Sequence, residues 1–321
     1  MKYLQRFILG VIGLLLAGGA MPLSQAKEPR DLSGAAASQC NRECLNGFVD
    51  QYLSALIAHD PAKLPLAKNV KFTENGQVLE IGDGLWRTAS SIGSYKLYVA
   101  DPEAGQVALI GTLDENGTFD ILVVRLKVVK GAVTEIETIV SRKDGDSMTR
   151  PEAFTAPLPI LLETLAPSER VSRKEMVAIA NSYFEGLEKA TGKFVPFDPE
   201  CNRRENGTQT TNNPAMGPWM AKLGCAAQFN TGFSKFVTRI PGRRYPVVDE
   251  EHGLVLSYVA FEHAGHIKNV KLTDGTDLVV PAPFTHPFQF QIAELFKIKN
   301  GKIRQIEAVL LTVPYGMKSG W

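Results

Sequence analysis

Phe48-Val-Asp-Gln-Tyr-Leu-Ser-Ala-Leu56 and Ile179-Ala-Asn-Ser-Tyr-Phe-Glu-Gly-Leu187 are two versions of one stretch, offset by 131 residues. At the same offset, Glu74-Asn-Gly76 is repeated as Glu205-Asn-Gly207. Two motifs in one register predict that the chain carries an internal repeat. An internal repeat predicts that both copies adopt the same fold, so the rest of the sequence is interpreted copy by copy.

Each copy is predicted to open with an amphipathic helix. Apolar residues recur at steps of three and four over Leu45–Leu56 and again over Met176–Leu187, which is the spacing of a single helical face. In the second copy Ser172 precedes the helix and Glu175 follows three residues later, a pattern that predicts a capping box.

Strands rich in β-branched residues follow each helix. The predicted strands are Gln106–Leu113, Asp120–Val129 and Ala132–Ser141 in the first copy, and Arg244–Asp249, Leu254–His263, Phe288–Lys299 and Lys302–Val313 in the second. Asn-Gly pairs mark the hairpin turns, because both residues tolerate the positive φ that such turns need. A helix followed by a meandering antiparallel sheet, twice over, predicts an α+β protein.

The predicted domain boundaries follow from this repeat. We expect residues 1–26 to be a signal peptide, 38–148 the first domain, 149–170 a proline-rich linker and 171–318 the second domain. The later motifs of the two copies are offset by 170 residues, so the second copy carries insertions, around Thr208–Ala227 and His266–Phe288. About 295 residues without the signal segment suit two domains of ordinary size.

The N-terminus has the three zones of a secretory signal. Lys2 and Arg6 precede an apolar stretch from Phe7 to Ala17, and a small-x-small cleavage motif ends at Ala26. We expect cleavage after Ala26 and a periplasmic or secreted protein; the alternative is an uncleaved N-terminal anchor. The mature chain is close to neutral and has no basic patch, which argues against nucleic-acid binding and against a membrane-bound mature form.

The four cysteines form two local pairs, Cys40 with Cys44 and Cys201 with Cys225, one pair in each copy. In an oxidising compartment this arrangement predicts two disulfides. Zinc is the alternative, but a Cys-x3-Cys pair with the other cysteines more than a hundred residues away is not a usual zinc spacing. We therefore expect no metal site.

Several motifs resemble a known family. The hairpin Phe296-Lys-Ile-Lys-Asn-Gly-Lys-Ile-Arg-Gln-Ile306 resembles the ending of SnoaL-like proteins in the nuclear transport factor 2 (NTF2-like) superfamily. Blocks similar to those of exported tandem members are Phe72–Gln77, Ile81–Thr88, Cys201–Gly207 and Arg243–Pro246. The resemblance implies two tandem cone-shaped domains, each with helices on a curved antiparallel sheet. It also implies an apolar pocket in each domain, with proton transfer that needs no metal or organic cofactor.

The candidate catalytic residues are polar groups on otherwise apolar strands. His263 shares the face of Val255, Val259 and Phe261, so it is a candidate acid or base, whereas a solvated strand-end histidine is the alternative. Glu205 and Arg243 are the other two candidates. The predicted disulfide at Cys201 is expected to hold Arg203 and Glu205 in place, and an ordinary ion pair with Arg243 or Arg244 is the alternative for them.

Further residues are candidates for substrate binding. They are Arg203, Asn206, Asn213, Tyr183, Tyr52, Asp83, Trp86 and Tyr95. Core packing is the alternative for the two helical tyrosines, and turn formation is the alternative for the asparagines and for Asp83.

Three classes of function fit these patterns. The first is a cofactor-free lyase, dehydratase or isomerase acting on a small, partly apolar molecule; the second is a non-catalytic periplasmic binder of such a ligand. The third is an interaction domain whose open sheets dock a protein or form a homo-oligomer. The absence of a Walker loop, a dinucleotide fingerprint, a Gly-x-Ser-x-Gly elbow and a His-Glu-x-x-His helix argues against cofactor-dependent chemistry.

Overall fold

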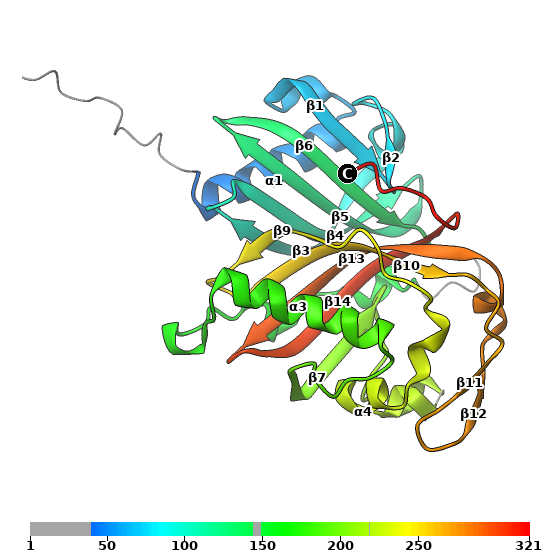
Figure 1. Cartoon of the computed structure of the whole chain (residues 1–321). Helices are drawn as coiled ribbons and strands as arrows, with labels where there is room; N and C mark the ends of the chain where they lie inside the picture. The colour runs from blue at the N-terminus through cyan, green and yellow to red at the C-terminus, as the bar shows by residue number, and fades with distance from the viewer. Residues whose placement is uncertain (1–39, 144–148, 218) are drawn as a thin grey trace, which may run out of the picture. The chain divides into compact units, whose positions relative to one another are not determined.

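A computed structural model describes residues 40–143, 149–217 and 219–321 (Figure 1). The predicted signal peptide lies outside the described residues. The first half contains α1 (Arg42–Ile57), β1 (Leu66–Glu74), β2 (Gln77–Val78), β3 (Ala89–Asp101), β4 (Gln106–Glu115), β5 (Thr118–Val129) and β6 (Ala132–Ser141). The second half contains α3 (Arg173–Glu188), β7 (Phe197–Glu205), β8 (Thr208–Gln209), α4 (Cys225–Asn230), β9 (Arg244–Asp249), β10 (Leu254–His263), β11 (Asn269–Lys271), β12 (Asp277–Val279), β13 (Phe288–Lys299) and β14 (Lys302–Val313). The helix α2 (Pro159–Leu162) lies between the halves.

Both halves build the same six-stranded sheet. The strand order is β2-β1-β6-β5-β4-β3 in the first and β8-β7-β14-β13-β10-β9 in the second. One long helix packs on each sheet, α1 on the first and α3 on the second (Figure 1). The expected α+β class, with a helix packed on a sheet in each half, is therefore confirmed.

The sheets are mixed, which differs from the antiparallel sheets that we expected. β1 pairs in parallel with β6, and β7 pairs in parallel with β14. The last strand of each half forms a hairpin with its predecessor and then lies beside the first long strand, so the two run in the same direction. All other pairings within these two sheets are antiparallel, as predicted.

The registers of β1, β6, β5 and β4 match those of β7, β14, β13 and β10 residue for residue at the rows compared below. Glu205, Ala308, Glu294 and Ser257 form one row across the second sheet, on β7, β14, β13 and β10. The corresponding row of the first sheet is Glu74, Thr138, Val124 and Leu109. This equivalence makes it possible to compare the two concave faces position by position.

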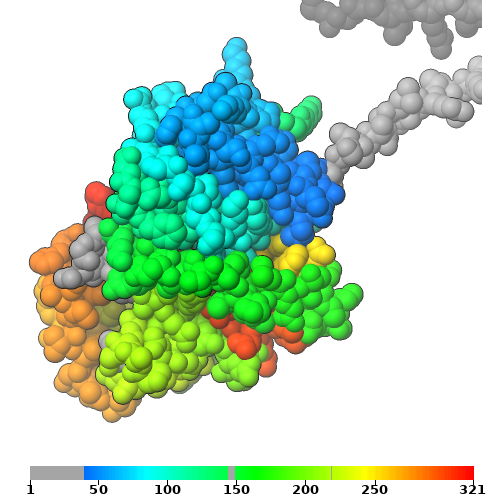
Figure 2. Space-filling view, turned by 180° about the vertical axis from the view of Figure 1, so that it is seen from behind, coloured from blue at the N-terminus to red at the C-terminus, as the bar shows by residue number. Residues whose placement is uncertain are grey.

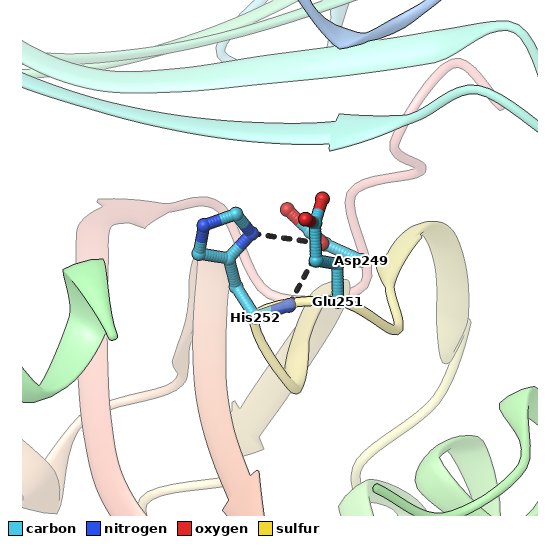
Figure 3. Close-up of side chains that lie close together, drawn as sticks. All are labelled: Asp249, Glu251 and His252. Atoms are coloured by element: carbon cyan, nitrogen blue, oxygen red, sulfur yellow. Dashed lines mark hydrogen bonds and ion pairs between the residues drawn. The ribbon is translucent and has the colours of Figure 1, made fainter. Parts of the chain in front are cut away.

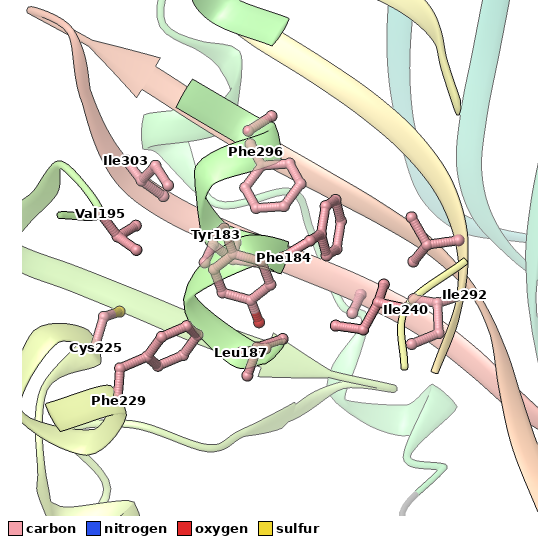
Figure 4. Packing of buried hydrophobic residues seen from close by; sticks show 14 of the residues in the cluster. Tyr183, Phe184, Leu187, Val195, Cys225, Phe229, Ile240, Ile292, Phe296 and Ile303 are labelled. Carbon is pink, nitrogen blue, oxygen red and sulfur yellow. The ribbon is translucent and has the colours of Figure 1, made fainter. Parts of the chain in front are cut away.

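Two of the hydrophobic cores lie between a helix and its sheet. In the second half, Tyr183 and Phe184 from α3 pack on Phe296 of β13, with ring centroids 5.2 and 5.6 Å apart (Figure 4). The predicted N-cap of this helix is confirmed, because the Ser172 hydroxyl accepts a hydrogen bond from the Glu175 N–H.

A third core joins the faces of the two sheets that point away from the helices. It contains Leu97 and Ile110 from the first sheet, Leu256 and Leu295 from the second, and Phe154 and Leu161 from the proline-rich segment between them. In Figure 2 the green segment that includes residues 150–165 crosses this face of the molecule as a band between the colours of the two halves. Burial of these side chains removes apolar area from water and stabilises the sheet pair.

Reciprocal ion pairs link the two halves. Arg42 at the start of α1 donates to both carboxylate oxygens of Asp249 at the end of β9, at 2.6 and 2.9 Å. Arg173 at the start of α3 pairs in the same way with Asp101 at the end of β3. Both aspartates are almost completely buried. The halves therefore contact each other through equivalent residues.

The second half carries its additional segments where the sequence predicts insertions. One contains α4, and the other contains the two-stranded β11–β12 hairpin. The predicted disulfides Cys40–Cys44 and Cys201–Cys225 are both formed. Among the described residues, no helix is long and apolar enough to cross a bilayer.

Candidate functional site

A cavity of about 110 Å³ lies between α3 and the concave face of the second sheet. Its walls are mostly apolar and aromatic, and its polar lining residues are Tyr183, Arg203, Glu205, His263 and Glu294. Ala308 lines it from the middle of the sheet, where a larger side chain would project into the space. Four of these five polar residues are candidates from the sequence, and Glu294 is not.

Glu294 and Glu205 lie on either side of Ala308, two strands apart. Neighbouring strands are about 4.8 Å apart, so the two backbones are separated by about 10 Å with only a methyl group between them. Burial raises the pKa of Glu294 to about 8, and the nearby Glu205 carboxylate also raises it, whereas Arg203 opposes the shift. Glu294 therefore carries a proton at neutral pH.

Arg203 is held in place by the inserted segment. Its Nη1 donates to Gln228 Oε1 at 2.5 Å, and its Nη2 donates to Glu205 Oε1. Gln228 is on α4, which the Cys201–Cys225 disulfide ties to β7 two residues before Arg203. The sequence-based idea that this disulfide positions Arg203 and Glu205 agrees with this arrangement. Glu205 pairs with Arg203 rather than with Arg243 or Arg244.

Three polar atoms at this end of the cavity make no hydrogen bond within the described part of the chain. They are the Tyr183 hydroxyl, Glu294 Oε2 and Arg203 Nε; the side chains of Tyr183 and Glu294 are close enough to affect each other's pKa, but not in hydrogen-bond geometry. Burial raises the pKa of Tyr183 well above its usual value, so the hydroxyl keeps its proton. Buried polar groups nearly always have a partner, so unpaired groups at a cavity wall point to a ligand or water as partner.

His263 lies at the other end of the cavity. It is 1% exposed and stacks on Phe288 with centroids 4.5 Å apart, so it is not the solvated strand-end residue that was the alternative. Burial lowers its pKa to about 4, which leaves the ring neutral at pH 7. Its Nδ1 is 3.1 Å from the carbonyl oxygen of Phe261, which can only accept, so Nδ1 carries the hydrogen and Nε2 the lone pair.

The strand register separates His263 from the two glutamates. Glu294 is opposite Ser257, and His263 is six residues further along β10. At about 3.3 Å per residue this is a path of about 20 Å along the strand. The cavity therefore has a polar end at Glu205 and Glu294, and an aromatic end at His263.

The first half keeps Tyr52 and Glu74 at the positions of Tyr183 and Glu205, but it has lost the other two polar residues at this end of the cavity. Phe72 and Val124 occupy the positions of Arg203 and Glu294 in the strand register. Trp86 fills the space instead: it is 1% exposed and meets Tyr52 edge to face at 5.3 Å. Tyr52 and Trp86 are thus core residues of the first half.

The remaining first-half candidates lie in other surroundings. Asp83 precedes a short 3-10 helix and pairs with the exposed Arg87, as expected of a turn residue. Tyr95 is on the face between the two sheets, where its ring contacts Phe154 at 4.9 Å. Neither residue is near the cavity of the second half.

Three second-half candidates also lie away from the cavity lining. Arg243 bonds to Asn181 and Glu188. Asn206 has a positive φ in a turn, and its side chain bonds to the backbone of Leu310 on β14. Asn213 caps a short helix by accepting from the N–H of Ala215.

A group that could hold a metal is found elsewhere, in the turn after β9. Asp249, Glu251 and His252 have ligand atoms within 4.8 Å of one another (Figure 3). The guanidinium group of Arg42 is bound by the first two, at 2.6 and 2.7 Å. His252 Nδ1 is 3.2 Å from Asp249 Oδ1. This cluster is therefore occupied by the arginine that joins α1 to the second half.

Fold and cavity together define an α+β protein of two equivalent halves, each a helix packed on a six-stranded sheet, with an apolar cavity and an ionisable cluster in the second half. The chain belongs to the family described as a domain of unknown function, DUF8021, whose model matches residues 38–140 and 169–310. Curated proteins give no significant match.

Solved structures show partial similarity. A de novo designed protein with a curved β-sheet is 16% identical, with 44% of this chain and 88% of that chain covered and a TM-score of 0.27. An NTF2-like protein of unknown function from Cytophaga hutchinsonii is 15% identical, with 31% and 89% covered and a TM-score of 0.25. AusH from Aspergillus nidulans is 15% identical, with 44% and 86% covered and a TM-score of 0.26.

Proposed function

We propose that the second domain binds a small, partly apolar molecule in its cavity and transfers a proton on it without a cofactor. The observation that carries this proposal is the cluster of Tyr183, Arg203, Glu205 and Glu294 at one end of an apolar cavity, with three hydrogen-bonding atoms unused. Ionisable groups with shifted pKa values that converge in one cavity are typical of catalytic sites.

The protonation states suit proton transfer next to a carbonyl group. Protonated Glu294, the Tyr183 hydroxyl and Arg203 Nε–H can donate hydrogen bonds to a carbonyl oxygen, while the Glu205 carboxylate accepts a proton from the adjacent carbon. The electron pair of the broken C–H bond then forms a C=C bond, and negative charge develops on the oxygen. Return of the proton at another carbon gives isomerisation, and loss of a β-substituent gives elimination.

We place His263 outside this chemical step. The strand register places His263, at the aromatic end of the cavity, six residues along β10 from the position opposite Glu294, too far to reach atoms that Glu294 contacts. There, His263 and the neighbouring phenylalanines would hold the apolar part of a longer ligand. Arg243 supports α3 through Glu188 and is not included in the catalytic set.

Deuterium exchange tests the reaction class without knowledge of the substrate. The protein is incubated in D2O with cyclohexanone and 4-hydroxy-2-butanone, and deuterium next to the carbonyl is measured by NMR. Glu205→Gln and Glu294→Gln should each reduce exchange by about 10²-fold or more, the usual contribution of an acid or base. The exposed Glu80→Gln is the matched control. Exchange at the buffer rate with both probes, or full exchange in both cavity variants, would contradict the assignment.

A ligand-binding protein without catalysis is the second candidate. The aromatic end favours it, because four phenylalanines, Phe236, Phe261, Phe284 and Phe290, line the cavity beside His263. Apolar walls of this kind bind a ligand by burial alone. A rise in melting temperature with cyclohexanone, without deuterium exchange, would identify the protein as a binder.

We also propose that the protein is exported and cleaved after Ala26. The two disulfides support this, since they persist in oxidising compartments. The mass of the protein recovered from outside the cytoplasm checks it: the chain should begin at Lys27. A chain that keeps the apolar segment would instead support an uncleaved anchor.

A further inference from the structure

A second cavity, of about 170 Å³, lies on the opposite face of the same two strands. Its floor is formed by Tyr258 and Ala260 of β10 and by Gln289 and Gln291 of β13. The segment Gly316–Trp321 contributes to its lining, and in Figure 1 the red end of the chain runs from β14 back towards β1 and β2.

This covering segment is fixed at both ends. Gln289 accepts from the N–H of Gly316 at 2.9 Å and donates to the carbonyl oxygen of Met317 at 2.8 Å. Trp321 Nε1 donates to Thr73 Oγ1 of the first sheet at 2.8 Å. The segment that lines one side of the cavity is therefore held by defined contacts from both halves of the molecule.

Three buried polar atoms on residues that line this cavity have no hydrogen-bond partner among the described residues. They are the Tyr258 hydroxyl, Gln291 Oε1 and Arg244 Nε. Tyr258 is 3% exposed and Gln291 is 5% exposed, so solvent outside the cavity does not reach them easily. Two of the three atoms are donors, because burial keeps the tyrosine protonated and an arginine Nε carries a hydrogen.

The charge of the lining is positive. Arg239, Arg244 and Lys318 contribute to it, and Glu262 is the acidic residue of the set. Glu262 is already bound by Arg239 through both carboxylate oxygens, at 2.9 and 2.7 Å. The guanidinium groups of Arg244 and Arg125 share the buried carboxylate of Glu137.

The apolar lining gives room for a small organic body. Pro241, Val259, Met317 and the Trp321 side chain provide these surfaces. An organic anion bound here would have its charge next to guanidinium groups and its carbon atoms on apolar side chains. Small-molecule sites commonly combine apolar walls with a few polar or charged groups, and arginine suits a carboxylate.

We propose that this cavity is a binding site for a small hydroxycarboxylate, separate from the cavity against α3. The carboxylate accepts hydrogen bonds from Arg244 Nε and the Tyr258 hydroxyl, and the ligand's own hydroxyl donates to Gln291 Oε1. The bound molecule holds the Gly316–Trp321 segment against the second sheet. This assignment is independent of the reaction proposed for the other cavity.

Isothermal titration calorimetry on the full chain tests the site, with lactate, mandelate and 4-hydroxybenzoate as probes and their amides as uncharged analogues. At least one acid should bind saturably, and its amide should bind at least tenfold more weakly. Tyr258→Phe removes only a hydroxyl that the protein does not use, so folding is retained, and it should weaken binding of that acid about tenfold.

Two control variants show whether the acid binds in this cavity. Tyr98→Phe removes a hydroxyl that bonds to Asp50 outside the cavity, and it should leave binding unchanged. Glu294→Gln in the first cavity should also leave it unchanged. The proposal is overturned by acids that do not bind or bind no better than their amides, by unaltered binding in Tyr258→Phe, or by binding that depends on Glu294.

Discussion

The surroundings of the buried Glu294 carboxyl group determine its protonation state. It lies on the apolar face of β13, where burial favours the neutral form and raises its pKa to about 8. The same position in the first half is occupied by Val124, which has no ionisable group. This difference, together with Phe72 at the position of Arg203, leaves the first half without the ionisable cluster of the second.

The raised pKa of Glu294 predicts how stability depends on pH. The folded-state pKa lies above the usual value of 4.5. The contribution of protonated Glu294 to the free energy of unfolding is therefore fully present below pH 4.5 and is lost as the pH rises through about 8. Between these two pH values, the free energy of unfolding should fall by on the order of 1 kcal/mol per pH unit for one such group.

Glu294→Gln should therefore lose less stability than the wild-type protein when the pH is raised from about 5 to about 8.5, the range over which the group ionises. Urea unfolding at several pH values measures this difference. Because Glu307, whose pKa burial raises to about 7, remains in both proteins, the comparison isolates Glu294. Parallel pH profiles for the two proteins would show that Glu294 is ionised in the folded state.

At the scale of elements, the insertion that contains α4 supports Arg203 at the cavity wall without lining the cavity itself. The disulfide joins α4 to β7, and Gln228 of α4 then bonds to Arg203 of β7. The first half has no such bridge between these elements: its disulfide links residues only four positions apart at the start of α1. The second disulfide therefore has a role in the site as well as in stability.

Replacing both Cys201 and Cys225 by serine should lower the free energy of unfolding by about 3 kcal/mol, the value expected for a loop of this length. The same variant should also weaken ligand-induced thermal stabilisation, because Gln228 no longer holds Arg203. The matched variant replaces Cys40 and Cys44, and it should leave ligand binding intact. Equal loss of binding in both variants would argue against a specific role for α4.

At the scale of the whole molecule, the halves are joined by equivalent arginine–aspartate pairs. Burial opposes ionisation of Asp249, but the hydrogen bonds and charges of Arg42 and His252 hold its pKa below its usual range. A lowered pKa means that the stabilisation is present above the usual value and is lost as pH falls through the folded-state value. The contact between halves should thus weaken in acid.

Arg42→Ala and Arg173→Ala should each lower the free energy of unfolding by about 3 kcal/mol, because each leaves a buried aspartate without its arginine, the cation between the two halves. Arg87→Ala breaks the exposed pair with Asp83 and should cost less than about 1 kcal/mol. Chemical unfolding of the three variants gives the comparison. Similar small effects in all three would show that the reciprocal pairs do not hold the halves together.

The sequence by itself determined the α+β class, several strand limits and the two cysteine pairs, whereas β1 and β3 were not among the strands that it predicted. The predicted bounds of Ala132–Ser141, Leu254–His263, Phe288–Lys299 and Lys302–Val313 match the structure. These features depend on local periodicity, turn residues and short-range spacing, which the chain carries without tertiary information. The sequence also indicated four candidate site residues that line one cavity, Arg203, Glu205, His263 and Tyr183.

Only the tertiary structure decided which polar residues meet. Glu294 is visible in the sequence as one acidic residue on the face formed by Phe290, Ile292 and Phe296, but its position beside Ala308 and Glu205 depends on strand register. The separation of His263 from the glutamates and the pairing of Arg243 with Glu188 depend on the same long-range geometry. Local patterns say which face of a strand a side chain occupies, whereas the packing of distant segments sets its neighbours and, through burial and charge, its chemistry.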